Sequence, residues 1–358
     1  MHPALLTNRA WLDEELAPFQ HLVVGLIDEG VRVAQVVPEG VSHEDLSSFG
    51  EQVWWRESRV STLNYFRLAG LNDTLTDMGV DLIHAMDGRL WRAALNLAEA
   101  MSVPAILSAY SKLDIRLAQR LLAAQDPSKV AVTTATEPLT GAIREVVSDN
   151  VLVRTIPPGV HVHQDSQSLS SPEQALCVIV SGNGEMDEDY QILLDGIARF
   201  IRSRPMTQFF FDGQGSTQHQ IWKAANAAGL LGNISLTPRR LGHREVLLKA
   251  HAIIHPQPLG RARSLTLRAM ARGMPVIARQ DPFLDYLIDG ETAVVLENPD
   301  ASQWVNVLDR LVEDVSRMTE LGQRAMDWVR RHRTTSQYVA GVLDMYRRMT
   351  GESIPFSS

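Results

Sequence analysis

The stretch Ala252–Ala278, AIIHPQPLGRARSLTLRAMARGMPVIA, decides the fold of this chain. It opens with the apolar run Ala252–His255 and closes with the apolar run Pro275–Ala278. Between them lie a polar loop and a segment of helical periodicity that begins near Ser264. Two short apolar runs that bracket a helix are typical of parallel strands, because parallel neighbours need a crossover connection. The stretch therefore predicts a parallel α/β sheet.

The same alternation runs through the rest of the chain, in two blocks separated by the polar, serine-rich stretch His163–Pro172. This stretch has no apolar periodicity and is interpreted as a linker. We therefore expect an N-terminal Rossmann-like domain over 1–162, a C-terminal Rossmann-like domain over 173–334, and a helix over 335–349 that crosses back to the first domain. The strands are predicted at 4–7, 31–37, 81–86, 105–108, 130–134 and 151–156 in the first block and at 176–181, 208–211, 234–236, 252–255, 275–278 and 293–296 in the second. The helices are predicted near 14–29, 60–78, 89–101, 115–125 and 137–147 in the first block and near 300–315, 318–332 and 335–349 at the end of the chain.

Composition places the chain among ordinary folded proteins. Its 358 residues suggest two domains at about 150 residues each, and 45% hydrophobic with 21% charged residues argues against disorder. The formal net charge of −8 gives no overall attraction to nucleic acid or to an anionic membrane, although local basic patches must be sought separately. We expect no nucleic-acid partner.

Cellular location follows from three further features. The single cysteine, Cys177, excludes an internal disulfide and a multi-cysteine zinc site, which fits a reducing compartment. No apolar run approaches the ~20 residues of a membrane helix, so no transmembrane segment is expected. The acidic residues Asp13, Glu14 and Glu15 stand where a secretory signal would be apolar. The sequence thus predicts a cytoplasmic protein.

Several short motifs follow one another in a fixed order. They are VDLIH at 80–84, TIPPGV at 155–160, FDGQG at 211–215, LRAMARGMPVIA at 267–278 and DGETA at 289–293. Together they resemble the retaining glycosyltransferases of family 4, and the resemblance covers nearly the whole chain. It implies the GT-B fold, in which the parallel sheets of two Rossmann-like domains face an interdomain cleft. It also implies sugar transfer from a nucleotide-sugar donor, with no cofactor and no metal.

The chain departs from this family at charged positions on which the family's chemistry depends. Gly260 and Arg268 stand where the family has two glutamates, eight positions apart, that contact the donor sugar and the nucleotide ribose. A guanidinium cannot replace a carboxylate as an acceptor, because it has only donors. Asn183 and Asp189 stand where the family has an arginine and a lysine for the donor diphosphate, and an aspartate there is expected to repel it.

The first domain departs as well. The glycine pair of the family's first loop is missing from residues 5–15, and Tyr110 occupies a position where the family often has a histidine. Tyr110 and His84, which lies near the end of the predicted strand 81–86, are candidates for residues that line the cleft. A structural role for His84 in the core is the alternative. No catalytic residue is assigned.

A basic stretch offers a replacement for the lost donor contacts. Residues 239–279 contain nine basic residues against one acid, Glu245. Arg261 and Arg263 precede a helix predicted to start near Ser264, and arginines beside a helix N-terminus favour a phosphate. A solvated surface and a protein contact are the alternative interpretations of the stretch. The candidates for a donor or anion site are Gly182, Asn183, Gly213, Arg261, Arg263, Ser264 and Arg268.

Other residues carry weaker signals. His161 and His163 alternate, but no cysteine or carboxylate at ligand spacing supports a metal site. Trp54 and Trp55 are predicted in a loop, where they either stack on a ligand or cover the core. Cys177, which is predicted to open a buried strand, is expected to be inert.

Two functions from different classes follow from these residues. The first is retaining, metal-independent transfer of a sugar from a nucleotide-sugar donor, with another phosphorylated small molecule as the broader ligand class. The second is a non-catalytic GT-B binding or scaffold protein that lost its donor site and serves a protein partner. Binding of nucleotide sugars separates the two hypotheses.

Overall fold

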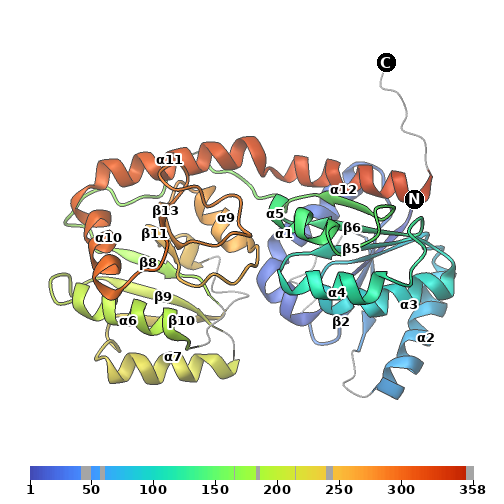
Figure 1. Ribbon diagram of the computed structural model, residues 1–358, viewed down its shortest axis with the longest axis horizontal. Coiled ribbons are helices and arrows are strands. Elements are labelled where there is room, and N and C mark those ends of the chain that lie inside the picture. Colours follow the sequence, from blue (N-terminus) through green and yellow to red (C-terminus); the bar gives the residue numbers. More distant parts are fainter. Residues whose placement is uncertain are drawn as a thin grey trace. The chain divides into compact units, whose positions relative to one another are not determined.

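The computed structural model describes residues 1–41, 50–56, 61–164, 166–182, 186–213, 215–238 and 245–351. The chain divides into two α/β units (Figure 1): unit 1 consists of Met1–Gly159 and Thr335–Ser358, and unit 2 consists of Val160–Thr334. Each unit contains one β-sheet in which every pair of neighbouring strands is parallel. The α/β fold class predicted from the sequence is therefore confirmed.

The sheet of unit 1 has the order β3-β2-β1-β4-β5-β6-β7. The chain moves outward from β1 to β3 and then returns to place β4 on the other side of β1. This reversal puts a topological switch point at the carboxyl ends of β1 and β4, the place where open parallel sheets bind ligands. The elements of unit 1 are β1 (Pro3–Leu6), α1 (Arg9–Asp28), β2 (Ala34–Pro38), β3 (Glu51–Trp55), α2 (Ser61–Asp77), β4 (Leu82–Ala85), η2 (Gly88–Leu90), α3 (Trp91–Met101), β5 (Ala105–Ala109), α4 (Leu113–Leu122), β6 (Val130–Thr134), α5 (Glu137–Arg144), β7 (Leu152–Thr155) and α12 (Thr335–Thr350).

The sheet of unit 2 has the order β10-β9-β8-β11-β12-β13, and its switch point lies between β8 and β11. Alternate residues of its strands, among them Val178, Val180, Phe209, Phe211 and Ile254, face a core under α6 and α10. The elements of unit 2 are β8 (Cys177–Val180), α6 (Glu188–Phe200), β9 (Gln208–Gly213), α7 (Gly215–Ala227), β10 (Ile234–Pro238), β11 (Ala252–His255), α9 (Ser264–Met270), β12 (Val276–Arg279), β13 (Val294–Leu296), α10 (Ala301–Glu313) and α11 (Val315–His332).

The loop predicted around Trp54 and Trp55 is wrong. These residues end β3, which pairs with β2, and the buried Trp55 donates from Nε1 to the carbonyl of Thr7 at 3.3 Å. Two adjacent tryptophans on an edge strand break the alternation by which strands are recognised in a sequence. The side chains therefore belong to the sheet rather than to an exposed loop.

The first helix also begins earlier than the sequence predicts, at Arg9 instead of near residue 14. The Asn8 side chain accepts a hydrogen bond from the backbone N–H of Trp11 at 2.9 Å and so caps the helix. Glu15 has non-helical dihedral angles (φ −116°, ψ 19°), and this break interrupts the apolar periodicity. The apolar periodicity of the sequence therefore did not reveal the first turn of α1.

The last helix, α12, lies in unit 1 although unit 2 precedes it in the chain. It packs against α1 and β4, with Tyr338, Val342, Leu343 and Tyr346 buried. Asp344 of this helix forms an ion pair with Arg154 of β7. Among the residues that the structure describes, no helix is both long and apolar enough to cross a bilayer.

Candidate functional site

A row of polar side chains lies at the carboxyl ends of the central strands of unit 2. The register pairs Val180 of β8 with Phe211 of β9 and with Ile254 of β11. One residue further on, Ser181 therefore lies between Asp212 and His255. Because side chains alternate along a strand, these three residues face away from the core under α6. All three are buried.

Arg263, from the loop that leads into α9, covers this row. Its guanidinium donates to Ser181 Oγ at 3.1 Å and to the Gly182 carbonyl oxygen at 2.9 Å, and it forms an ion pair with Asp212. The arginine is only 2% exposed. Burial of both charges is costly unless each is paired and hydrogen-bonded, and this geometry meets that condition. Arg263 thereby joins the ends of β8 and β9 to the loop after β11.

His255 adds a neutral imidazole beside this ion pair. Burial and, secondly, the charge of Arg263 lower the pKa of His255 to about 4, so the ring is uncharged at neutral pH. Neither ring nitrogen has a hydrogen-bond partner among the described parts of the chain. A neutral imidazole with one donor and one acceptor therefore stands at the end of the strand beside the switch point.

The loop after β8 is held close to the loop after β11. Asp187 caps α6 by accepting from the backbone N–H of Tyr190 at 3.0 Å, and it accepts from Gln257 Nε2 at 2.6 Å. A Cβ atom on Gly182 would lie 2.7 Å from Gln257 Oε1 and would also collide with the Tyr190 ring. Only glycine fits at position 182, which was selected from the sequence as a donor-site candidate. Asn183, the next candidate, lies outside the described residues.

The two positions that lack the family's glutamates have different environments. Gly260 adopts a left-handed conformation (φ 60°), and its N–H donates to the buried carboxylate of Asp281 at 2.7 Å. Arg268 of α9 is half-buried. Burial lowers the pKa of His163, near the start of unit 2, and the charges of Arg272, His161 and, last, Arg268 lower it further.

The remaining candidates of unit 2 lie along the same loop. Arg261 is half-buried, Ser264 is buried at the first position of α9, and α9 is a short helix of 7 residues. Gly213 is the last residue of β9, and the burial of this position lies outside what the structure describes. A donor or anion role for these residues stays a prediction.

The sequence suggested that Asp189 presents an unpaired negative charge to a bound anion. The structure shows that this charge is paired. It lies in the first turn of α6 and forms an ion pair with Arg279 at the end of β12, and Arg279 also donates to Asn298 Oδ1 at 3.2 Å. Because Arg279 neutralises the carboxylate, the expected repulsion of an anion is largely removed. Two of the basic residues of 239–279, Arg263 and Arg279, thus form ion pairs with acidic residues from other segments. Arg239, Arg240 and Arg244 lie outside the described residues.

In unit 1, His84 is a structural residue within a buried hydrogen-bond network. Nδ1 is 2.7 Å from the Tyr346 hydroxyl, and Nε2 is 2.8 Å from Ser108 Oγ, which is 2.8 Å from Thr133 Oγ1. The ring is 1% exposed, and burial lowers its pKa to about 3. The network joins β4, β5 and β6 to α12.

Tyr110 follows β5 at the carboxyl edge of the same sheet. Its hydroxyl lies 3.5 Å from that of Tyr338, and burial together with Tyr338 raises the pKa of Tyr110. Burial likewise raises the pKa of Tyr338 to about 12. Glu14 and Glu15 of α1 are buried acids of this unit, and the sequence did not indicate them as site residues.

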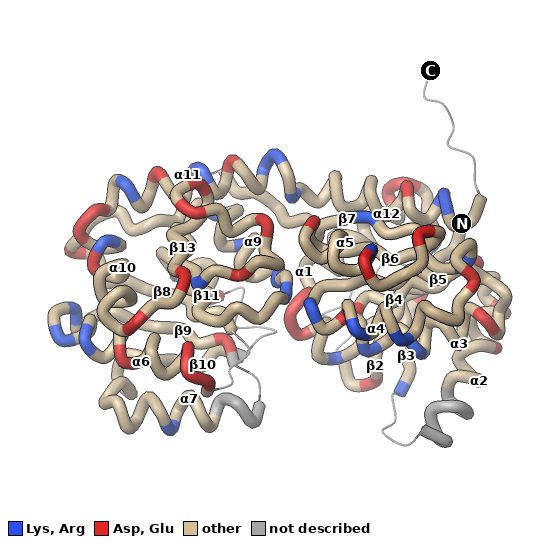
Figure 2. Tube along the Cα trace, in the orientation of Figure 1, with Lys and Arg blue, Asp and Glu red and all other residues tan. Residues whose placement is uncertain are grey.

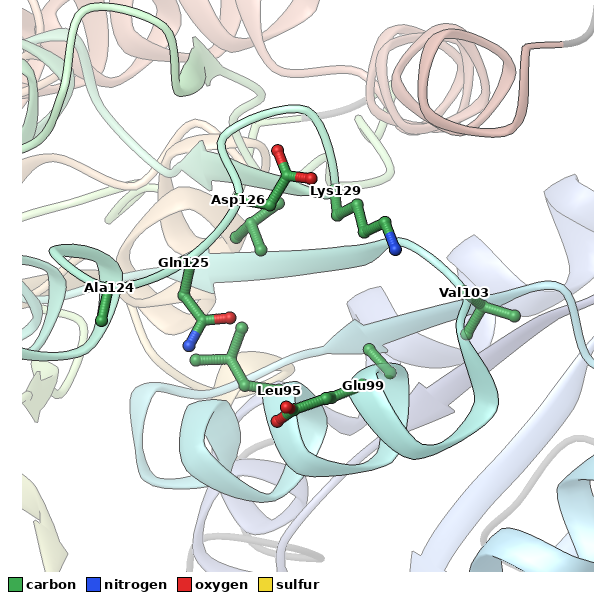
Figure 3. Close-up of a pocket in the computed structure, with 9 residues that line it drawn as sticks. Leu95, Glu99, Val103, Ala124, Gln125, Asp126 and Lys129 are labelled. Atoms are coloured by element: carbon green, nitrogen blue, oxygen red, sulfur yellow. The ribbon is translucent and has the colours of Figure 1, made fainter.

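Two hollows lie at the opposite, amino edges of the sheets. In unit 1 a cavity of about 250 Å³ lies between the end of α3 and the loop before β6, with Glu99, Asp126 and Lys129 among its lining residues (Figure 3). In unit 2 a groove of about 350 Å³ is lined by residues that include Arg204, Met206 and Leu176. Neither contains a residue predicted for the site. The described residues also hold no cluster of three histidine, cysteine or acidic side chains arranged for a metal.

Comparison with known proteins bears directly on unit 2. Residues 162–328 match the family Glycosyl transferases group 1. The match covers nearly the whole of unit 2. The lipopolysaccharide core biosynthesis glycosyltransferase LpsE of Rhizobium meliloti (strain 1021) is 24% identical over 164 residues, which is 45% of this chain and 46% of LpsE. The chain thus matches about half the length of this curated relative.

Solved structures resemble the chain over nearly its whole length. Sucrose-phosphate synthase from Thermosynechococcus elongatus superposes with a TM-score of 0.77 at 15% identity, covering 99% of this chain and 100% of that one. Anabaena HepE, solved in complex with UDP and glucose, has a TM-score of 0.76 at 11% identity, covering 97% and 99%. At such identities the likeness establishes the fold, and the fold is GT-B, as the motifs indicated.

Proposed function

We propose that this protein transfers a sugar from a nucleotide-sugar donor to an acceptor, with retention at the anomeric carbon and without a metal ion. The observation that carries the proposal is the match of residues 162–328 to the family Glycosyl transferases group 1. HepE, which shares the fold, was solved with UDP and glucose and with UDP-glucose. A nucleoside diphosphate sugar is therefore the ligand class with the best support.

The donor is assigned to the carboxyl edge of the unit 2 sheet. Departure of a nucleoside diphosphate places negative charge on its terminal phosphate, so stabilisation of the leaving group is the main catalytic demand. In this proposal Arg261 supplies a positive charge to the diphosphate. Arg263 acts indirectly, because its guanidinium is already committed to Asp212 and to the Gly182 carbonyl. It holds the loop that the diphosphate approaches.

The replacement of the two glutamates sets an expectation for rate. Gly260 offers no carboxylate to the sugar, and Arg268 offers none to the ribose. Each lost charge-assisted hydrogen bond costs about 1.5 to 3 kcal/mol. Turnover with common uridine or guanosine diphosphate sugars is therefore expected to be much slower than in family members that keep both glutamates.

Donor binding tests the proposal. Calorimetric titration with UDP, GDP and their glucose conjugates should give saturable binding, and Arg261→Ala should weaken it about 10- to 100-fold through loss of one charge-assisted contact. Lys249→Ala is the matched control, since Lys249 is an exposed cation of the same basic stretch and should bind as wild type does.

The chemistry is checked in the same preparation. NMR of the product should show a retained anomeric configuration, and a chelator should leave the rate unchanged. Failure to bind any nucleoside diphosphate or nucleotide sugar would contradict the proposal and favour a non-catalytic scaffold. Equal affinity of Arg261→Ala and wild type would remove Arg261 from the site.

A further inference from the structure

The cavity of unit 1 lies at the amino edge of the sheet, away from the carboxyl ends of its strands (Figure 3). Its volume is about 250 Å³. Pockets for drug-sized ligands typically measure about 300 to 1,000 Å³. A molecule bound in this cavity must therefore be small.

The wall that α3 contributes to the cavity is apolar. Leu95 and Ala98 of this helix are buried, and so is Val130, the first residue of β6. Val103, which precedes β5, is half-buried. A ligand with a hydrocarbon portion would remove this wall and itself from water, which is favourable.

Three charged side chains line the rim of the cavity. Glu99 comes from α3, and Asp126 and Lys129 come from the loop before β6 (Figure 3). Asp126 is committed to its own turn, because its Oδ1 accepts from the Ser128 hydroxyl at 2.8 Å and from the Ser128 N–H at 3.0 Å. The pKa of Asp126 is lowered, first by these hydrogen bonds and also by the charge of Lys129. The charges of Asp126 and Lys129 thus largely offset each other.

Glu99 supplies the net charge of the cavity. Within the described parts of the chain its carboxylate has no ion pair or hydrogen bond, and the side-chain amide of Gln125 has no hydrogen bond. Glu99 lies in the last turn of α3, where no basic side chain offsets the partial negative charge of the helix C-terminus. Both signs of charge are spread over unit 1 (Figure 2), so the excess of negative charge is local to the cavity. The rim therefore favours a cation.

One class of ligand fits both the wall and the rim. An anion would be attracted by Lys129 but repelled by Glu99 and Asp126. A bare metal ion would gain nothing from the apolar wall, and the described residues hold no group of three side chains that could bind one. An organic ammonium group pairs with Glu99 and donates to the side-chain carbonyl of Gln125, while a short hydrocarbon chain covers the wall.

We propose that this cavity binds a small primary amine, with its ammonium group against Glu99 and a short hydrocarbon chain against Leu95 and Ala98. Open parallel sheets bind their ligands at the carboxyl ends of the strands, which is the opposite edge. The amine site is therefore separate from the site proposed for the nucleotide sugar in unit 2. The inference does not depend on sugar transfer, because it concerns only residues of unit 1.

Saturation-transfer NMR on the full chain tests the inference with three probes of nearly the same shape. They are isopentylamine, a cation, isopentanol, which is neutral, and isovalerate, an anion. We expect saturable binding of the amine, and binding of the other two weaker by about fivefold or more, the upper value of one exposed ion pair. Glu99→Gln should weaken binding of the amine about fivefold. Lys129→Gln should not weaken it, because this change removes a like charge.

A matched control separates Glu99 from acidic residues in general. Glu145 is an exposed acid at the end of α5 that lies outside the cavity, so Glu145→Gln should leave amine binding unchanged. Ala124→Trp places a large side chain at the exposed rim of the cavity and should abolish saturable binding.

Thermal unfolding checks that each variant folds, and the exposed change Glu99→Gln serves if Ala124→Trp does not. Absence of saturable amine binding by wild type, or equal affinity of Glu99→Gln and wild type, would overturn the inference. So would tighter binding of isovalerate than of isopentylamine, which would identify an anion site.

Discussion

At the scale of single residues, the ion pair between Arg263 and Asp212 is the most consequential feature of unit 2. Both side chains are almost wholly buried. In this pair each charged group has exchanged hydrogen bonds to water for hydrogen bonds to the protein. The exchange compensates for the lost hydration only while both members are present. A lone Asp212 carboxylate or a lone Arg263 guanidinium would remain desolvated without its counter-charge.

We therefore predict that Arg263→Ala and Asp212→Ala each lower the free energy of unfolding by about 3 to 5 kcal/mol. The double variant should lose clearly less than the sum, because it leaves no unpaired charge. Urea unfolding followed by tryptophan fluorescence measures these differences. The control is Asp189→Ala, which breaks the more exposed pair with Arg279 and should cost about 1 kcal/mol or less. Additive effects of the two buried changes would contradict the coupling.

Residues also show where sequence reasoning stops. The sequence shows that position 260 has no carboxylate. It does not show that Gly260 has a left-handed φ of 60° or that its N–H donates to Asp281. Likewise, the sequence counts Arg263 as a free cation, because its partner lies 51 positions away in the chain. Asp212 and His255 were missed as members of the site since only strand register brings them beside Ser181.

At the scale of elements, the network around His84 connects α12 to the strands of unit 1. The folded-state pKa of His84 is about 3, well below the ordinary value of 6.5, because burial disfavours its charged form. The unfolded chain therefore binds a proton more readily than the folded one. The stability contributed by the neutral ring is present above pH 6.5 and is lost as the pH falls below that value.

We predict that wild type loses about 1.4 kcal/mol of unfolding free energy per pH unit below 6.5 through His84, down toward pH 3. His84→Gln removes the titrating group, so the difference between variant and wild type should shrink as the pH falls. The comparison also cancels the contribution of His255, whose pKa is lowered to about 4 in both proteins. Urea unfolding between pH 7 and pH 4 gives the two curves. A pH-independent difference would show that His84 does not titrate on unfolding.

Most elements were predictable because their periodicity is regular. The apolar runs of β4, β5, β6 and β11 and the stripe of α12 are read directly from the sequence. The strand β3 and the start of α1 were not, since paired tryptophans and a break at Glu15 disturb the period. The local sequence pattern therefore located most strands of the two sheets, whereas tertiary contacts determined the edge strand β3 and the start of α1.

At the scale of the whole molecule, the order of the chain and the composition of the units do not coincide. Unit 2 is continuous from Val160 to Thr334, but unit 1 needs α12 from beyond it. The bond between His84 and Tyr346 spans 262 positions. Unit 1 can therefore be completed only after unit 2 has been synthesised.

This arrangement predicts different fates for the two halves when they are separated. Four large apolar side chains of α12, Tyr338, Val342, Leu343 and Tyr346, are buried in unit 1. At about 1.5 to 3 kcal/mol each, their loss is comparable with the whole stability of a domain, about 5 to 15 kcal/mol. We therefore expect residues 1–159 alone to lack cooperative unfolding, and residues 160–334 alone to unfold cooperatively with heat. Joining residues 335–351 to 1–159 through a long glycine-serine linker should restore the transition, because it returns α12 to its place beside α1. Circular dichroism melting of the three fragments decides the matter. A cooperative transition in residues 1–159 without α12 would show that unit 1 forms a stable core without this helix.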